Sequence, residues 1–374
     1  MKDALHVRLI QLLLLFYSLF FVSITYSENS AAAFAELELK SSIAILPLVF
    51  FTIGLQSNHY LQLLKAYILG CFIATSYSLL SIAYDICINN MHRAPDQLLG
   101  VDWVYFSYFL PKQINLHSPY FSMYLVMAIF ILAYLFCYEY VRKRNTFILS
   151  AYLVLILYFV VFTIMLASRT ALLAGFLITG ISLLAFLIFS RKKFLTLALL
   201  ILMPFIAFKA FETVPYLKRK LQDMSGMEQR QTVWSTSIDL ISENILFGLG
   251  TGDTKDELVK AYKKNDYNEG IEQKYDPHNQ YIQITLALGI VGLLVYILII
   301  FTLLATSINL KNLLLAIFTV LFVLCGITES NLTTQKGVIF FSFFVSLFAI
   351  LKDQLNKRAE VLETKSGEIV VQKH

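Results

Sequence analysis

Long apolar runs alternate with short polar segments along most of the chain. Many of these runs have the roughly 20 residues that an α-helix needs to cross a hydrocarbon core of about 30 Å. The pattern predicts an all-α fold, a polytopic transmembrane helical bundle of about ten spans. The predicted spans cover residues 7–25, 41–56, 61–83, 119–138, 147–166, 170–189, 194–211, 280–304, 311–328 and 337–351.

Two of the N-terminal runs leave an alternative open. Residues 1–35 combine Lys2 and Arg8 with an apolar run and the small-residue stretch AAAFA, so they also resemble a cleavable signal peptide. The apolar run is long for a signal peptide, which favours a retained first helix. The 41–56 run is short and ends in the polar stretch QSNH, and a re-entrant segment is its alternative.

Two polar segments are longer than a connection between spans requires. Residues 84–118 form the first and residues 212–279 form the second. In the second segment, apolar residues recur at helical spacing until a glycine ends the pattern. They are Val233, Trp234, Ile238, Ile241 and Ile245, followed by Gly248. This spacing predicts an amphipathic helix that lies against the membrane domain.

The predicted organisation of the chain has three parts. Residues 1–140 hold the N-terminal transmembrane helices with the outer loop at 84–118. Residues 141–351 hold a second transmembrane domain with the long outer loop at 212–279. Residues 352–374 form a polar cytoplasmic tail without strong periodicity.

Composition and charge indicate a membrane protein and its orientation. Hydrophobic residues make up 58% of the 374 positions and charged residues 15%, whereas a soluble domain is about half apolar and about a quarter charged. The net charge of +5 comes from short basic clusters between the runs, such as residues 142–144 and 191–193. The positive-inside rule places these clusters in the cytoplasm and both long polar segments outside. A nucleic-acid partner is therefore not expected.

The four cysteines predict neither a disulfide nor a metal site. Cys71, Cys137 and Cys325 lie within apolar runs, Cys87 lies just beyond one, and no CxxC spacing occurs. No metal and no cofactor are expected.

Arginines in two outer positions are candidates for binding an anion. Arg169 lies in SRTALLAG between two apolar runs, where Ser168 is placed to cap the next helix and Arg169 falls in its first turn. The helix dipole disfavours a cation there, so an anionic ligand such as a phosphate would relieve the conflict. A snorkelling side chain at a tight turn is the alternative. Arg230, near the start of the amphipathic helix, is the second candidate for binding an anion. The alternative is that it lies on a helix face in contact with water.

A basic cluster in the same outer segment also fits an anion. Lys218, Arg219 and Lys220 follow one another directly. Such clusters commonly remain solvated or contact lipid headgroups, which is the alternative here. These residues and Arg230 matter for chemistry only if they converge on one anion.

His278 is the sharpest chemical signal. In YDPHNQYIQ, Asp276 fits a helix N-cap and Pro277 fits the first helical position, which puts His278 in the first turn of a span. A helix N-terminus disfavours the imidazolium, so His278 is expected to be neutral at pH 7 and able to accept a proton. The alternative is an interfacial histidine without chemistry.

His117 in NLHSPYFSMY is the second-choice site histidine. Glu329 in TESNLTTQKG is an outer carboxylate that serves a substrate or caps a helix.

The glycines of GLGTG at residues 248–252 do not predict a dinucleotide site. They follow no buried strand and open no βαβ unit. A flexible or tight turn that returns the amphipathic helix toward the membrane is the favoured interpretation.

The order of these motifs resembles the O-antigen ligase and O-antigen polymerase superfamily of bacterial polytopic membrane glycosyltransferases. SRTALLAG comes first, followed by an outer loop with an arginine and an amphipathic helix ending in GLGTG, and then by PHNQY leading into LGIVGLL. The similarity is clearest from about residue 150 to residue 300, and ESNLTTQKGVIFF is in keeping with it.

The resemblance implies a metal-independent glycosyltransferase of lipopolysaccharide biosynthesis in the bacterial inner membrane. It implies that an undecaprenyl-diphosphate-linked glycan is the donor and that the glycan is moved, on the periplasmic side, to an acceptor hydroxyl such as one of the lipid A core. The two arginines and the histidine of the family's site carry over to Arg169, Arg230 and His278. Lys218, Arg219, Lys220, Glu329 and His117 are then substrate-binding candidates.

Two alternatives to the ligase remain at this point. A polymerase of O-antigen or exopolysaccharide repeat units shares the donor and differs in the acceptor. A polysaccharide or lipid transporter is the second alternative, for which ionisable residues at mid-span and paired Gly or Pro breaks are expected. Most predicted spans contain neither feature. The exceptions are Pro204 and Lys209, near one end of the predicted span 194–211.

Overall fold

The computed structural model describes residues 5–53, 57–88, 105–142, 145–189, 209 and 225–351. Within these ranges the regular structure is entirely helical. The all-α prediction is therefore confirmed for this part of the chain. The helices divide between two compact units, one made of Met1–Lys65 with Arg230–His374 and the other of Ala66–Gln229.

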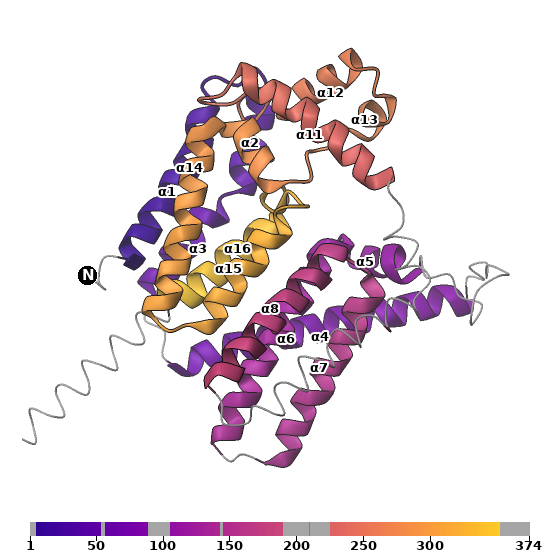
Figure 1. Ribbon diagram of the computed structural model, residues 1–374, viewed down its shortest axis with the longest axis vertical. Coiled ribbons are helices and arrows are strands. Elements are labelled where there is room, and N and C mark those ends of the chain that lie inside the picture. Colours follow the sequence, from indigo (N-terminus) through magenta and orange to yellow (C-terminus); the bar gives the residue numbers. More distant parts are fainter. Residues whose placement is uncertain are drawn as a thin grey trace, which may run out of the picture. The chain divides into compact units, whose positions relative to one another are not determined.

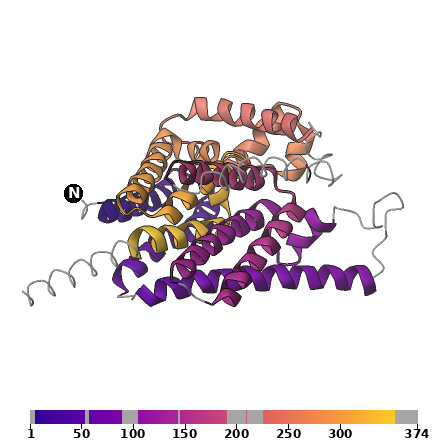
Figure 2. The same ribbon diagram turned by 60° about the horizontal axis from the view of Figure 1, so that its bottom comes forward.

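The helices of the first unit come from both ends of the chain (Figures 1 and 2). Before the division they are α1 (Leu5–Ser23), α2 (Ser30–Leu39), α3 (Ser42–Thr52) and the first residues of α4 (Ser57–Ile88). After it they are α11 (Ser225–Glu243), α12 (Thr254–Lys264), α13 (Asn268–Gln273), α14 (Gln280–Asn309), α15 (Leu313–Cys325) and α16 (Gln335–Val345). A 3-10 turn, η3 (Asn331–Thr333), precedes α16, and a π-helical turn, η4 (Ser346–Leu351), follows it.

Aromatic side chains fill the centre of this unit. α1 packs along α14, where the Phe16 and Tyr296 rings lie 5.9 Å apart between centroids. Phe318 of α15 is fully buried against the rings of α16 and η4, with Phe344 at 5.4 Å and Phe348 at 6.3 Å. Interlocking rings of this kind supply the dispersion contacts that hold helices together in lipid, where burial from water contributes little.

The second unit is built around α6 (Ser118–Val141), which packs on α7 (Thr146–Leu166) and on α8 (Arg169–Phe189). The Phe121 and Phe162 rings lie 5.2 Å apart between α6 and α7. Tyr67 of α4 donates a hydrogen bond to the carbonyl of Tyr124 at 2.9 Å, which ties α4 to α6. A π-helical turn (Tyr105–Phe109) and the short α5 (Leu110–Lys112) precede α6.

Four described helices are long and apolar enough to cross a membrane. They are Asn58–Ile88, Ser118–Val141, Thr146–Leu166 and Gln280–Asn309. Four shorter apolar helices, Val7–Ser23, Arg169–Ala185, Leu313–Cys325 and Gln335–Ala349, coincide with further predicted spans. The predicted span 194–211 lies outside the described residues apart from Lys209. The number of about ten spans and the domain boundaries at residues 140 and 351 stay predictions.

The structure differs from the predicted spans in several bounds. α4 extends to Ile88, beyond the predicted end at residue 83, and α3 has only 11 residues with Pro47 inside it. The helix α2 was not predicted. Asn29 caps it through its side chain, which accepts a hydrogen bond from Ala32 N at 3.1 Å, and the small residues that follow favour a helix after such a cap.

The largest departure from the prediction is a break inside α14. Gly289 has φ +65° and ψ −166°, so the helical hydrogen bonds are interrupted there. The segment after α11 inserts its own backbone into this break. Leu249 N donates to Leu286 O at 2.8 Å and Gly250 N to Ala287 O at 3.1 Å, while Ile290 N donates to Ile245 O at 2.8 Å. We call this arrangement the backbone clamp.

The backbone clamp explains why glycines occur on both sides of it. Gly248 has φ +70°, and a Cβ there would lie 2.6 Å from Gly289 N and 2.7 Å from Leu286 O. A Cβ at Gly289 would overlap the Leu246 carbonyl. In the GLGTG sequence, the backbone therefore packs directly against the backbone of α14. Of the two turns considered for this sequence, flexible or tight, the structure has the tight one.

Candidate functional site

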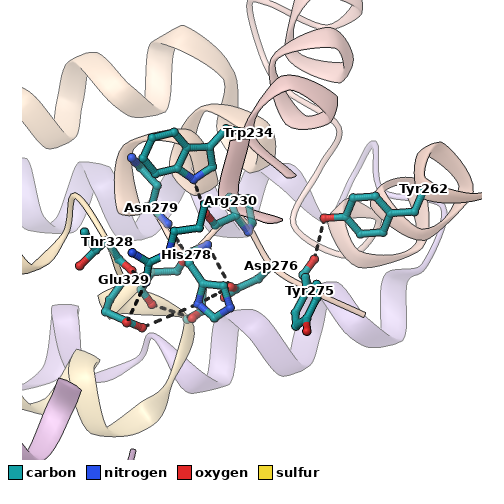
Figure 3. A network of polar contacts seen from close by, with 12 residues as sticks. Arg230, Trp234, Tyr262, Tyr275, Asp276, His278, Asn279, Thr328 and Glu329 are labelled. Atoms are coloured by element: carbon teal, nitrogen blue, oxygen red, sulfur yellow. Dashed lines mark hydrogen bonds and ion pairs between the residues drawn. The ribbon is translucent and has the colours of Figure 1, made fainter. Parts of the chain in front are cut away.

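Three segments of the first unit meet at the N-terminal end of α14 (Figure 3). They are the first half of α11, the connection between α13 and α14, and the connection between α15 and η3. Arg230, His278 and Glu329 each come from one of these segments. The structure therefore brings together three of the candidate residues, although 51 residues separate His278 from Glu329 in the sequence.

Asn279 fixes the position of His278. Its side-chain oxygen caps α14 by accepting hydrogen bonds from Tyr281 N at 3.0 Å and Ile282 N at 3.1 Å. Its side-chain nitrogen donates to Ile327 O at 3.0 Å, and its backbone nitrogen donates to Ser330 Oγ at 3.2 Å. One buried residue thus starts the helix and holds the connection that carries Glu329 beside it.

The neighbouring residues strengthen the same attachment. Gln280 N donates to Gly326 O at 2.7 Å, and Gln280 Oε1 accepts from Leu332 N at 2.6 Å. From the other side, the indole nitrogen of Trp234 donates to Pro277 O at 2.7 Å. Since Trp234 lies one helical turn after Arg230, this bond also sets Arg230 on the face of α11 that meets His278.

The segment that carries Arg230 shares a small core with α14. Val233, Leu258, Tyr262 and Leu286 are buried together. The Tyr262 hydroxyl donates to Tyr275 O at 2.9 Å, which holds the chain three residues before His278. α11 (Ser225–Glu243) covers the residues whose spacing predicts a helix. Its contact with the membrane and the outer position of the segment stay predictions.

His278 is held by two carboxylates. Its Nδ1 lies 3.2 Å from Asp276 Oδ1 and 3.7 Å from Glu329 Oε2, and its backbone nitrogen donates to Asp276 Oδ1 at 3.0 Å. No hydrogen bond or ion pair among the described residues involves Nε2, and the side chain is 43% exposed. With Nδ1 facing the carboxylates, Nε2 is the nitrogen that can exchange a proton with a bound molecule.

Glu329 lies between the histidine and the arginine. Its Oε1 is 3.9 Å from Arg230 Nη2, and Arg230 Nη2 also donates to Thr328 O at 3.4 Å. The Glu329 side chain is 17% exposed and that of Arg230 is 39% exposed. Arg230 is thus held through Nη2, and the other N–H groups of its guanidinium can donate hydrogen bonds to a ligand.

The structure corrects two predictions about His278. α14 begins at Gln280 with Asn279 as its N-cap, so His278 precedes the helix, in a left-handed conformation with φ +45°. The pKa of His278 is also raised above its ordinary value of 6.5. Burial lowers this pKa, but the carboxylates of Glu329 and Asp276 raise it and outweigh both burial and the charge of Arg230. The helix dipole is not the dominant influence.

Glu329 should therefore control the pH at which His278 becomes neutral. If transfer requires a neutral His278, the acidic limb of log kcat/KM against pH lies above pH 6.5 in the wild-type protein. Glu329→Gln removes a contact that raises the pKa, so the limb should shift to lower pH. Glu269→Gln is the matched control, because it removes a carboxylate that binds the Tyr275 hydroxyl and leaves Asp276 and Glu329 in place. An unchanged limb in Glu329→Gln would contradict this coupling.

Arg169 and His117 belong to the second unit, and their positions are described only within it. Arg169 is the first residue of α8, as predicted, and follows Ala167, which ends α7 with φ +49°. The Arg169 Nε is buried and has no hydrogen-bond partner among the described residues. His117 is exposed at the N-cap of α6, where the next residue, Ser118, donates its hydroxyl to Leu166 O. Both residues therefore lie at one end of the α6–α8 group.

The unpartnered Nε of Arg169 is a chemical signal. A buried donor without an acceptor costs about 1 to 3 kcal/mol, and more for a charged group. An anion that accepted a hydrogen bond from Nε would remove that cost. The basic cluster Lys218, Arg219 and Lys220 lies outside the described residues.

Three residues of the site were not assigned a role in it from the sequence. Asn279, Gln280 and Trp234 position the chemical groups through long-range hydrogen bonds. A sequence signal exists only for Asn279, since asparagine is a preferred N-cap and stands directly before the apolar run. No group of three or more His, Cys, Asp or Glu residues that could hold a metal ion is present in the described ranges.

Comparison with known proteins gives one family match. Residues 153–297 match the family model described as O-antigen ligase. The matched range contains Arg169, Arg230 and His278 and ends before Glu329. None of the curated proteins compared with the chain matches it.

Proposed function

Because the chain carries a domain of the O-antigen ligase family over residues 153–297, we propose that it transfers a glycan from an undecaprenyl-diphosphate carrier to an acceptor hydroxyl. The acceptor is the lipid A core, and the reaction takes place on the periplasmic side of the bacterial inner membrane. The proposal places the reaction at the Arg230–Glu329–His278 cluster. That cluster, at the N-terminal end of a helix long enough to span a membrane, is the observation that carries the proposal.

The residues have complementary roles in this reaction. His278 Nε2 takes the proton from the acceptor hydroxyl, whose oxygen then forms a bond to the anomeric carbon of the donor sugar. The bond between that carbon and the diphosphate oxygen breaks, and the carrier diphosphate leaves with the electron pair. Arg230 binds the diphosphate and stabilises its growing charge. Arg169, in the second unit, stays a predicted phosphate-binding residue. Asp276 and Glu329 hold the histidine and stabilise its protonated form.

The arginines supply the positive charge that glycosyl transfer from a diphosphate needs, so we propose that no divalent metal takes part. Purified protein reconstituted in lipid nanodiscs should transfer glycan from the lipid-linked donor to the lipid A core in the presence of excess EDTA. Loss of transfer with EDTA, together with rescue by magnesium or manganese, would refute the metal-independent reaction.

The same reconstitution separates the ligase from the repeat-unit polymerase. A ligase joins the donor glycan to the lipid A core. A polymerase lengthens the glycan on its carrier lipid when the core is absent. Mass analysis of the products therefore decides between the two acceptors. A protein that yields neither product while it moves the lipid-linked glycan between leaflets would be a transporter.

The fork geometry of Arg230 gives a further prediction. Lysine keeps the charge but loses the paired donors, so Arg230→Lys should lower kcat/KM by roughly tenfold or more. Arg142→Lys is the matched control, since Arg142 stacks over the Tyr138 ring at 4.3 Å, at the C-terminal end of α6 and away from His117. Equal activities for the two variants would show that Arg230 acts as a simple point charge or takes no part.

A further inference from the structure

The segment between α11 and α12 exposes large apolar side chains. Ile245 is 55% exposed, Leu246 60% and Phe247 62%. No charged residue occurs between Glu243 and Asp253. A polar outer segment in contact with water alone would not be expected to expose three consecutive large apolar residues.

The backbone clamp sets the depth of these residues along α14. Ile245 O accepts from Ile290 N at 2.8 Å, and Leu246 O accepts from Val291 N at 3.4 Å. Residue 290 lies ten positions after the start of α14 at Gln280, which corresponds to about 15 Å of helix. The polar residues Gln280 and Gln283 lie before that level and the long apolar run lies after it. The exposed tip is therefore level with the apolar part of a helix that is long enough to span a membrane.

Exposed apolar surface continues from the tip along neighbouring helices. On α14, Leu294, Leu298 and Phe301 are 53%, 52% and 66% exposed and follow one another at about one helical turn. On α1, Phe21 and Val22 near its C-terminal end are 59% and 51% exposed. The tip is thus bonded to a helix that itself exposes large apolar residues, as a membrane span does toward lipid.

The backbone of the tip also suits an apolar environment. Irregular backbone is tolerated at membrane depth where its polar groups are satisfied by protein. The carbonyls of Ile245 and Leu246 bind α14, and the carbonyl of Phe247 accepts from the Tyr26 hydroxyl at 2.9 Å. Tyrosine favours the boundary between hydrocarbon and water, where its ring and hydroxyl meet different surroundings.

We propose that Ile245, Leu246 and Phe247 form a re-entrant wedge that enters the hydrocarbon of the leaflet nearest α11. Its partner is the acyl chains of the bilayer. The wedge directly follows the helix that carries Arg230, and the clamp joins it to the helix that follows His278. It therefore holds both residues at a constant depth, where a phosphate at the membrane surface can reach them. The proposal rests on α14 as a membrane span and not on the transfer reaction.

The depth of the wedge can be measured with a nitroxide spin label. Cys87 and Cys137 are exposed and are replaced by serine, whereas Cys71 and Cys325 are buried and stay. A cysteine at Phe247 is labelled in full-length protein in nanodiscs of phosphatidylethanolamine and phosphatidylglycerol. Lys263 of α12, which is exposed and charged, is the matched control. Accessibility to oxygen reports hydrocarbon, and accessibility to a nickel chelate reports water.

The wedge requires the ratio of oxygen to nickel accessibility to be several-fold higher at position 247 than at position 263. Equal ratios would place the tip in water and overturn the proposal. Low accessibility to both reagents would place it against protein, such as a second copy of the chain, and would also overturn it. A label at Leu246 repeats the measurement if Phe247→Cys does not fold. The spin-label measurement does not use transfer activity. A label in hydrocarbon on a protein without transfer activity would therefore refute the proposed transfer reaction and leave the wedge in place.

Discussion

Replacement of His278 by alanine should lower transfer by roughly a hundredfold or more while the donor still binds. The imidazole is the group proposed to take the proton, because Asp276 and Glu329 face its Nδ1 and leave Nε2 for the acceptor. Binding of the diphosphate depends on the arginines and should change little. The expected signature is a fall in kcat with a nearly constant donor affinity, measured in nanodiscs with purified lipid-linked donor.

Two further variants test this role of His278. His278→Gln keeps a hydrogen-bonding side chain but cannot accept the proton, so it should be as slow as the alanine variant. His117→Ala removes the second-choice histidine, which has no side-chain capping hydrogen bond at the start of α6. If well-inserted His278→Ala keeps near-wild-type activity and His117→Ala loses it, the site belongs at His117 and the 84–118 loop.

Replacement of Gly289 by alanine should destabilise the protein by roughly 3 kcal/mol or more. The added Cβ would overlap Leu246 O and Phe247 N, which are backbone atoms and cannot move independently, and φ +65° is itself unfavourable for alanine. The break in α14 would then lose the hydrogen bonds of the backbone clamp, and each unsatisfied backbone group in hydrocarbon costs several kcal/mol. Thermal unfolding in detergent should show a markedly lower Tm.

Gly180→Ala is the matched control for this prediction. Gly180 lies inside α8, and an added Cβ would meet nothing within 4 Å. Alanine stabilises a helix interior by about 0.5 to 1 kcal/mol relative to glycine, so this variant should unfold at or slightly above the wild-type temperature. If the Gly289→Ala and Gly180→Ala proteins had the same Tm, the backbone clamp would not contribute to the stability of the fold.

Local patterns in the sequence predicted most of the described helices and pointed to the candidate residues. Apolar runs of spanning length gave α1, α6, α7, α8 and α14, and helical spacing around Trp234 gave α11. His278 and Glu329 stand out as ionisable residues beside predicted spans, and Arg230 as a cation near the start of the predicted amphipathic helix. The candidate site therefore stays a prediction that rests on residue type and position along the chain.

The remaining features depend on contacts between distant segments. The pKa of His278 rises because Glu329, 51 positions later, approaches its ring, and local spacing does not report that approach. The break at Gly289 lies in LALGIVGLL, which has the composition of an uninterrupted span. Only the three-dimensional partner of that glycine, the GLGTG segment, reveals why the helix opens there. The match to the O-antigen ligase family supports the function but leaves the acceptor to experiment.

The backbone clamp also bears on how the protein is assembled during synthesis. Residues 245–250 precede residues 286–291 in the chain, so they leave the ribosome first. In the proposed orientation they also cross the membrane before α14 enters the translocon. α14 cannot satisfy its own backbone at Gly289 when it moves sideways into lipid. The earlier segment must fold back and supply the missing hydrogen bonds at that moment. The last steps of membrane insertion are therefore coupled to folding on the far side, and a defect in the loop would appear as a failure of topology.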